Sequence, residues 1–143
     1  MDLVPENSVG AHLLSASYHG DIANVRRLTM EGVDPNISDR WGRTPLSLAA
    51  EKGHLAVVEI LIAAKASVDP YEEYSIFDTP LITAAENGYL NVVQVLVAAG
   101  ANLEHHGGPS LATAEFYARS NGHKEISDYL GSMNRRAKDS GNQ

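Results

Sequence analysis

The sequence predicts an all-α solenoid of four helix–turn–helix repeats joined by hairpin-like fingers. One short phrase recurs four times in the 143 residues, with its glycine at Gly20, Gly53, Gly88 and Gly122. These glycines are 33, 35 and 34 residues apart, and a period near 33 residues is typical of stacked copies of one supersecondary unit. Each of the two middle copies also holds two helix-length segments around its glycine, so we expect pairs of helices that stack along one axis.

A Thr-Pro pair predicts the start of the first helix in each middle repeat. Thr44 and Thr79 can accept backbone N–H bonds as N-caps. Pro45 and Pro80 fit the first helical turn, where a missing N–H is harmless. The helix then carries two alanines, which allow a neighbouring helix to approach closely. It ends at the repeat glycine, which tolerates the positive φ of a tight C-terminal turn.

An apolar segment follows the glycine, at residues 55–62 and 90–97. Its β-branched residues are also consistent with a buried strand by periodicity alone, but the flanking glycine and the repeat register favour a helix between neighbouring repeats. Lys65 follows the first of these segments, where the first and third repeats have Gly32 and Gly100. We expect a left-handed backbone at this position, which a lysine adopts less readily than a glycine.

Equivalent positions of the four repeats should align as columns of the core. The columns are Ala16, Ala49, Ala84 and Ala118; Leu28, Leu61, Leu96 and Leu130; and Leu13, Leu46, Leu81 and Glu115. The outer repeats are polar at other places where the middle ones are apolar: Arg27 replaces Ile60, and Ser127 replaces Val58. Because terminal repeats of a solenoid need polar outer faces, this predicts a complete, self-capped array, with sequence drift as the alternative. The expected organisation is a repeat domain, 1–132, with repeats at about 7–38, 39–73, 74–107 and 108–132, and a polar flexible tail, 133–143.

The clearest copies of the phrase are GRTPLSLAAEKGH at residues 42–54 and DTPLITAAENGY at residues 78–89. They resemble the ankyrin repeat, and the resemblance covers roughly residues 7–132. It implies a protein-binding scaffold whose partner varies, rather than a fixed chemistry. The family often has a histidine in the phrase Thr-Pro-Leu-His that bonds back to the threonine. Ser47 and Ile82 stand there in this chain, and of the two side chains Ser47 alone can make such a bond.

The resemblance also implies a concave binding face, formed by the fingers and the exposed side of each first helix. Carried over by position, the candidate partner-binding residues are Tyr18 and His19; Arg40, Trp41, Arg43, Glu51 and Lys52; Ser75, Ile76, Asp78, Glu86 and Asn87; and Ser110 and Asn121. Trp41 is the single tryptophan and falls at a finger tip. Beside Arg40 and Arg43 it has the composition of a binding hot spot. The alternative is that Trp41 folds back on the adjacent finger as local packing.

The finger at residues 70–78 is two residues longer than its counterpart before Thr44. It adds Tyr71 and Tyr74 to the candidate partner-binding residues, beside Ile76 and Phe77. Exposed aromatic side chains in a solvent-facing segment favour contact with a partner. The alternative is that Tyr71 or Phe77 tucks under the finger and holds an irregular loop together.

The composition excludes several classes of function. The chain has no cysteine, which removes disulfides, thiolate catalysis and cysteine-ligated metals. Its net charge of −7 argues against binding of a nucleic-acid backbone. The adjacent His105 and His106 have no third ligand nearby in the sequence, so we expect no metal site. His54 and His123 follow a repeat glycine, where the resemblance implies a structural role.

No catalytic motif is present, so we expect neither an enzyme nor a cofactor. The main hypothesis is a protein–protein interaction module that binds its partner through the concave face. The alternative is a dedicated inhibitor or immunity protein that docks its fingers in the active-site cleft of an enzyme, and a structural or chaperone-like protein is a third class. We expect a soluble monomer and a protein partner with a basic surface, because the chain is acidic. Residues 1–6 lack a signal pattern, which favours the cytoplasm and leaves the periplasm and secretion open.

Overall fold

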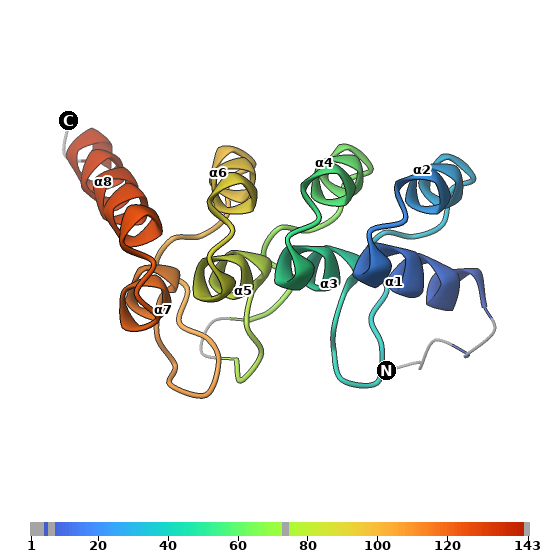
Figure 1. Ribbon diagram of the computed structural model, residues 1–143, viewed down its shortest axis with the longest axis horizontal. Coiled ribbons are helices and arrows are strands. Elements are labelled where there is room, and N and C mark those ends of the chain that lie inside the picture. The colour runs from blue at the N-terminus through green and yellow to red at the C-terminus, as the bar shows by residue number, and fades with distance from the viewer. Residues whose placement is uncertain (1–4, 6–7, 73–74, 142–143) are drawn as a thin grey trace.

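The computed structural model describes residue 5, residues 8–72 and residues 75–141. These residues form eight helices and one isolated antiparallel bridge, between Gly107 and Ala112. The helices are α1 (Val9–His19), α2 (Ile22–Met30), α3 (Pro45–Lys52), α4 (Leu55–Ala63), α5 (Pro80–Asn87), α6 (Leu90–Ala98), α7 (Ala114–Ser120) and α8 (Lys124–Gly141). They pair along the chain and form two rows, α1, α3, α5 and α7 in one and α2, α4, α6 and α8 in the other (Figure 1). The predicted all-α repeat architecture is therefore confirmed.

The predicted caps define where the first helices begin. Thr44 Oγ1 accepts a hydrogen bond of 3.1 Å from the backbone N–H of Ser47, and Ser47 Oγ accepts one of 2.8 Å from the N–H of Thr44. This reciprocal pair is a capping box, so Ser47 does bond back to the threonine. Thr79 caps α5 through the N–H of Ile82 alone, at 3.2 Å, since the isoleucine side chain has no acceptor.

The repeat glycines end the first helices with a left-handed backbone, and a ring from the next repeat covers each of the first three. Gly20 has a φ of 72°, and a Cβ built on it would lie 2.7 Å from the ring of His54. The same ring places its Nε2 3.0 Å from the carbonyl oxygen of Tyr18. The structural role expected for the histidine is thus confirmed. In the same way Tyr89 covers Gly53 and His123 covers Gly88.

The alanine and leucine columns form the core between the two rows of helices. All four residues of each of these two columns are buried. The third column is buried through Leu13, Leu46 and Leu81 and ends at Glu115, which is half-buried and whose Oε1 lies 2.7 Å from Nη2 of Arg119. A carboxylate is tolerated there because no further described repeat covers α7.

The turn after the second helix has the expected backbone. Lys65 has a φ of 71°, close to those of Gly32 and Gly100 at the equivalent positions. Asn36 links this turn to the preceding repeat, because its Oδ1 accepts a 2.7 Å hydrogen bond from the N–H of Ser67. The lysine is therefore held in a left-handed conformation by contacts between repeats.

The expected flexible tail is not what the structure shows for residues 133–141. These residues continue α8 without a break, so the expected boundary at residue 132 lies inside a helix. Met133, Ala137 and their basic neighbours are good helix formers, and Nζ of Lys138 lies 3.7 Å from Oε1 of Glu104. Residues 142 and 143 lie outside the described part. Among the helices described here, none is long and apolar enough to cross a bilayer.

Candidate functional site

The three fingers all project on one side of the molecule, away from α2, α4, α6 and α8 (Figure 1). They connect α2 to α3, α4 to α5, and α6 to α7. We call the surface made by these fingers and the exposed sides of α1, α3, α5 and α7 the finger face. The candidate residues chosen from the sequence lie on the fingers or on α1, α3 and α5, except Asn121, which directly follows α7, and Tyr74, which lies outside the described residues.

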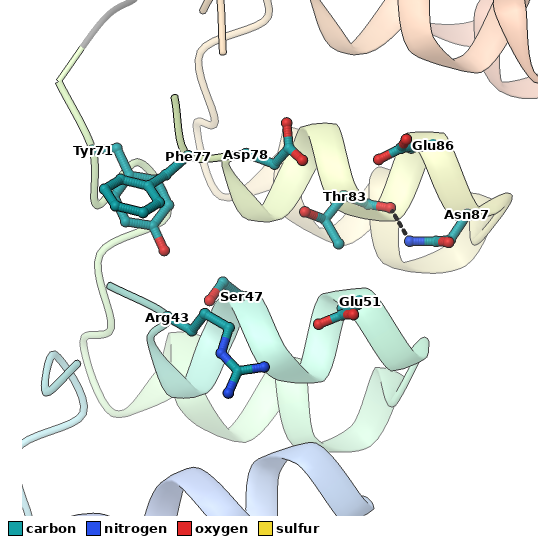
Figure 2. Close-up of a pocket in the computed structure, with 9 residues that line it drawn as sticks. All are labelled: Arg43, Ser47, Glu51, Tyr71, Phe77, Asp78, Thr83, Glu86 and Asn87. Atoms are coloured by element: carbon teal, nitrogen blue, oxygen red, sulfur yellow. Dashed lines mark hydrogen bonds between the residues drawn. The ribbon is translucent and has the colours of Figure 1, made fainter. Parts of the chain in front are cut away.

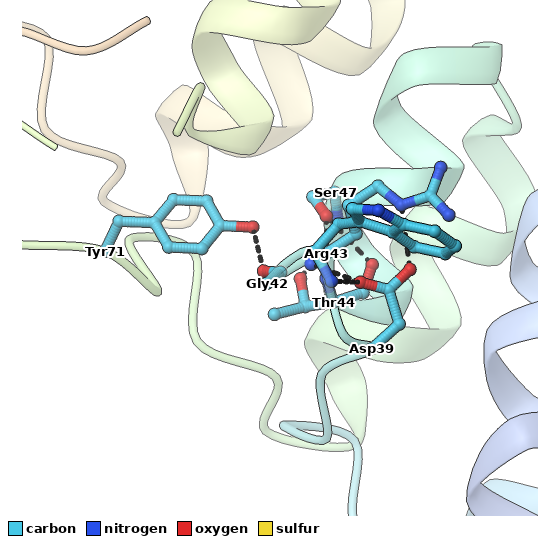
Figure 3. Close-up of polar contacts among 7 residues, drawn as sticks. Asp39, Gly42, Arg43, Thr44, Ser47 and Tyr71 are labelled. Atoms are coloured by element: carbon cyan, nitrogen blue, oxygen red, sulfur yellow. Dashed lines mark hydrogen bonds and ion pairs between the residues drawn. The ribbon is translucent and has the colours of Figure 1, made fainter. Parts of the chain in front are cut away.

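The first finger is closed by a single carboxylate. Oδ1 of Asp39 accepts hydrogen bonds of 2.9 Å from the backbone N–H groups of Trp41 and Arg43. Its Oδ2 lies 2.8 Å from Nε of Arg43, so the same side chain also makes an ion pair (Figure 3). Gly42 supplies the positive φ, 77°, that the turn requires. The finger is therefore a rigid base for the tryptophan at its tip.

Trp41 stays exposed, at 59% of its surface. The guanidinium carbons of Arg40 and Arg43 lie 5.2 and 4.9 Å from the centre of its ring, within cation–π range. The ring thus packs against arginines of its own finger and keeps most of its surface open to solvent. The alternative, in which it folds back on the adjacent finger, is not what the structure shows.

The second finger is braced against the first. The hydroxyl of Tyr71 donates a 2.7 Å hydrogen bond to the carbonyl oxygen of Gly42 (Figure 3). The ring of Phe77 lies 5.4 Å from that of Tyr71, centre to centre, and packs against Gly42. Burial raises the pKa of the Tyr71 hydroxyl. The tucked arrangement therefore holds for Tyr71, while Phe77 remains 40% exposed and Ile76 75% exposed.

A pocket of about 350 Å³ opens between α3 and α5 at the base of the second finger (Figure 2). Six of the candidate residues meet there: Arg43, Glu51, Tyr71, Asp78, Glu86 and Asn87. Ser47, Phe77 and Thr83 also line it and were not among the candidates. Ser47 and Thr83 each precede a candidate on the same helix by four residues, Glu51 and Asn87. This spacing places both members of a pair on one helical face, and it is the signal that would have found them.

Asp78 is the unusual group of this pocket. Its Oδ1 is buried without a hydrogen-bond partner, and no ion pair in the described part of the chain includes it. Burial, and then the negative charge of Glu86, raises the pKa of the Asp78 carboxyl to about 6. Gly108 lies so close that a Cβ built on it would overlap Oδ1 of Asp78 and lie 2.7 Å from the hydroxyl of Tyr117. The carboxyl is thus confined by the third finger.

The remaining candidates lie along the finger face on either side of this pocket. Tyr18 forms an edge-to-face pair with His19, with ring centres 5.0 Å apart, and Nζ of Lys52 lies 4.8 Å from the Tyr18 ring centre. Ser75 Oγ accepts a 3.1 Å hydrogen bond from the N–H of Phe77, which shapes the second finger.

Two candidates from the last repeat make contacts that organise the fold. Asn121 donates a 3.0 Å hydrogen bond from Nδ2 to the carbonyl oxygen of Glu86, and the N–H of Ser110 donates one of 3.1 Å to the hydroxyl of Tyr117. His105, on the third finger, is buried. Within the residues that the structure describes, no group of three or more side chains is arranged to hold a metal ion.

Comparison with known proteins gives the family. A family model for ankyrin repeats, in three copies, matches residues 13–107. The chain is 40% identical over 65 residues to the mitochondrial liver isoform of glutaminase from Rattus norvegicus, over 46% of this chain and 11% of that enzyme. It is 45% identical over 49 residues to ankyrin repeat domain-containing protein 46 of Rattus norvegicus, over 34% of this chain and 22% of that protein.

The chain spans less than a quarter of the length of these relatives, so the similarity does not carry the glutaminase activity to it. The family match, in contrast, covers more than half of the chain and includes the two clearest copies of the repeat phrase. The described helices also form one pair for each copy of the repeat phrase. The chain therefore belongs to the ankyrin-repeat family.

Proposed function

We propose that this protein is a non-enzymatic interaction module that binds another protein through its finger face. The observation that carries the proposal is the exposed Trp41, packed against two arginines on a finger that Asp39 closes with hydrogen bonds. A large side chain that is already ordered loses little conformational freedom when a partner covers it, and tryptophan and arginine are enriched in binding hot spots.

The second finger extends the same surface. Ile76 and Phe77 are exposed on it, and Tyr71 ties it to the first finger, so the apolar contacts of both fingers are presented together. The net charge of −7 favours a partner with a basic surface and predicts that association weakens as salt rises.

The test is affinity capture from a native extract with three forms of the full chain. One is the unaltered protein, one carries Trp41→Ala and Ile76→Ser, and one carries Met30→Ala as a matched control. Met30 is 80% exposed at the end of α2, outside the finger face. All three must melt cooperatively at similar temperatures.

We expect a partner that the unaltered protein and the control retain and the double variant loses. Equal retention by all three forms would overturn the proposal, because the site would then lie off the fingers. Where the retained partner is an enzyme, titration of its activity tests the inhibitor alternative. Inhibition that is complete at one equivalent would show a dedicated inhibitor, and full activity in the complex would show an adaptor.

A further inference from the structure

We propose that the pocket between α3 and α5 takes one basic side chain, an arginine or a lysine, of the protein bound at the finger face. This inference rests on the proposed function and adds to it the chemistry of one subsite. The pocket holds about 350 Å³ and is open to solvent beside the second finger (Figure 2). That is room for one long side chain inserted from a partner lying over the fingers.

Three carboxylates from different segments line the pocket. Glu51 comes from α3, Asp78 from the second finger, and Glu86 from α5, and Figure 2 shows Glu51 and Glu86 on the sides of the two helices. Acidic groups on a protein surface are common and would not by themselves indicate a ligand. Here the three line one cavity together with two aromatic rings, and one of them, Asp78, has an oxygen that lacks a hydrogen-bond partner.

The positive charges near these carboxylates are engaged elsewhere as well: Lys52 acts on Glu51, but its Nζ lies 4.8 Å from the Tyr18 ring centre. Among the described residues that line the pocket, Arg43 is the one basic side chain. Its Nε is paired with Asp39 at 2.8 Å, and its guanidinium carbon lies 4.9 Å from the ring centre of Trp41. In Figure 2 its guanidinium points away from α5. The arginine is therefore committed to the first finger, and the pocket keeps a net negative potential.

Asp78 is the group that a cation would stabilise most. A buried carboxylate oxygen without a partner is costly when the group is ionised, and Oδ1 of Asp78 is in that position. The raised pKa of the same carboxyl, about 6, is the expected result of its burial and of Glu86 nearby. Oδ1 itself is enclosed beside Gly108, so a guanidinium or ammonium group in the pocket acts on this carboxylate through its positive charge, which favours the ionised form and offsets the repulsion from Glu86.

The aromatic end of the pocket suits both the methylene stem and the cationic group of such a side chain. The rings of Tyr71 and Phe77 stand together at one end, 5.4 Å apart, with Asp78 next to them and Glu51 and Glu86 further along the two helices (Figure 2). Cations pack favourably on aromatic faces, and the methylene stem of lysine or arginine covers apolar surface. An anion is disfavoured by the same carboxylates.

The probe for this site is a short peptide, acetyl-Gly-Gly-Arg-Gly-Gly-amide. Its controls are the peptides with lysine and with citrulline, the neutral analogue of arginine, at the central position. Each is titrated into the ¹⁵N-labelled full chain at low salt and at near-physiological salt, and backbone chemical shifts are followed. We expect the arginine and lysine peptides to shift the amides of Glu51, Asp78 and Glu86 in a saturable way, more weakly at higher salt, and the citrulline peptide to bind at least about tenfold more weakly.

Two isosteric variants test the residues. Asp78→Asn and Glu86→Gln should each weaken the arginine peptide about tenfold, while Glu59→Gln, which removes an exposed charge from α4, should leave its affinity unchanged. Thermal melts establish that each variant is folded. Shifts that map elsewhere, equal binding of the citrulline peptide, or unchanged affinity in both pocket variants would each overturn the assignment.

The same variants separate this inference from the proposed function. A variant with both Asp78→Asn and Glu86→Gln is also used in the capture experiment. If it retains the Trp41-dependent partner, and if the arginine peptide does not bind the unaltered protein, the pocket assignment fails and the proposed function stands. If the peptide binds the pocket but capture of the partner is independent of Trp41, the subsite is real and the finger-face function fails.

Discussion

The hydroxyl of Tyr71 donates a 2.7 Å hydrogen bond to the backbone carbonyl oxygen of Gly42, 29 residues earlier in the chain. The bond joins the second finger to the first. It also places the Tyr71 ring at the end of the pocket between α3 and α5. One contact between neighbouring repeats thus positions both the finger that presents Ile76 and one wall of the candidate subsite.

Replacement of Tyr71 by Phe tests this bond. We expect the free energy of unfolding to fall by about 0.5–1.5 kcal/mol, since one hydrogen bond is lost while the ring contact with Phe77 remains. Urea unfolding measures the change. Tyr89→Phe is the control, because that tyrosine covers Gly53 with its ring and its hydroxyl makes no hydrogen bond to another described residue. An equal loss in both variants would mean that the Tyr71 hydroxyl contributes nothing specific.

Lys65 is expected to be a site of backbone strain. With a φ of 71° it adopts a conformation that glycine reaches at little cost. Lys65→Gly should therefore stabilise the protein by roughly 0.5–1 kcal/mol, and Gly100→Ala, at a φ of 93°, should destabilise it. Thermal and urea unfolding give both values. A loss of stability in Lys65→Gly would show that the lysine side chain contributes more than its backbone costs.

The ring over Gly53 predicts a difference between two glycine substitutions. In Gly53→Ala the new Cβ would lie 2.6 Å from the Tyr89 ring at a φ of 72°, whereas in Gly122→Ala, at a φ of 79°, it would meet nothing within 4 Å. Both substitutions place alanine in a left-handed backbone, at roughly 1 kcal/mol. Gly53→Ala should cost about 1–3 kcal/mol more, because the ring must move. Equal values by urea unfolding would show that the ring moves freely.

Asp78 should make stability depend on pH. Its pKa is raised from 3.8 to about 6 in the folded chain, so the folded state binds more protons than the unfolded state between these values. The ionised Asp78 carboxylate lowers the free energy of unfolding. This effect is absent below about pH 4 and reaches its full size above about pH 6. Asp78→Asn should then be more stable than the unaltered protein at pH 7, by about 1 kcal/mol for a partly exposed group.

The measurement is urea unfolding at pH 4, 5, 6 and 7, with Glu59→Gln as the control for loss of one negative charge. The stability difference between Asp78→Asn and the unaltered protein should appear between pH 4 and pH 6. A difference that is the same at all four values would contradict the raised pKa.

The affinity of the arginine peptide should rise with pH for the same reason. At pH 5 most molecules carry a proton on Asp78, and a bound cation favours the ionised form, so the proton must leave when the peptide binds. We expect affinity to increase from pH 5 to pH 7 and to level off above, with a flatter profile in Asp78→Asn. Among the described residues, the titratable groups beside this carboxyl are Glu86 of α5, Tyr71 of the second finger and Tyr117 of α7, and Glu51 of α3 and Arg43 of the first finger line the same pocket. A steep profile that persists in Asp78→Asn would assign the titration to another group.

Local signals in the sequence were sufficient for most of the fold. Thr44 and Ser47 lie within one turn, so their capping box depends on residues three apart. The repeat glycines identify the helix ends, because a left-handed turn selects glycine over other residues. The polar composition of residues 133–141 suggested a frayed tail, yet Met133, Ala137 and the basic residues beside them are good helix formers, and the segment extends an anchored helix.

The candidate site was predictable as a surface but not as an arrangement. The ankyrin pattern indicates which residues point outward, and Trp41, Asp78 and Glu86 were found in that way. That Tyr71 folds onto Gly42, that Asp78 is confined beside Gly108, and that Trp41 packs on its own arginines are contacts made in space.

Sequence alone therefore specified the repeat, its caps and its buried columns, because these depend on neighbours a few residues apart and on a period that is visible in the chain. The three-dimensional packing of one repeat on the next specified which side chains of the fingers are free and which carboxyl lacks a partner. Tyr71 and Gly42, or Asp78 and Gly108, are about 30 residues apart, and their contacts follow from the stacking geometry rather than from any local preference.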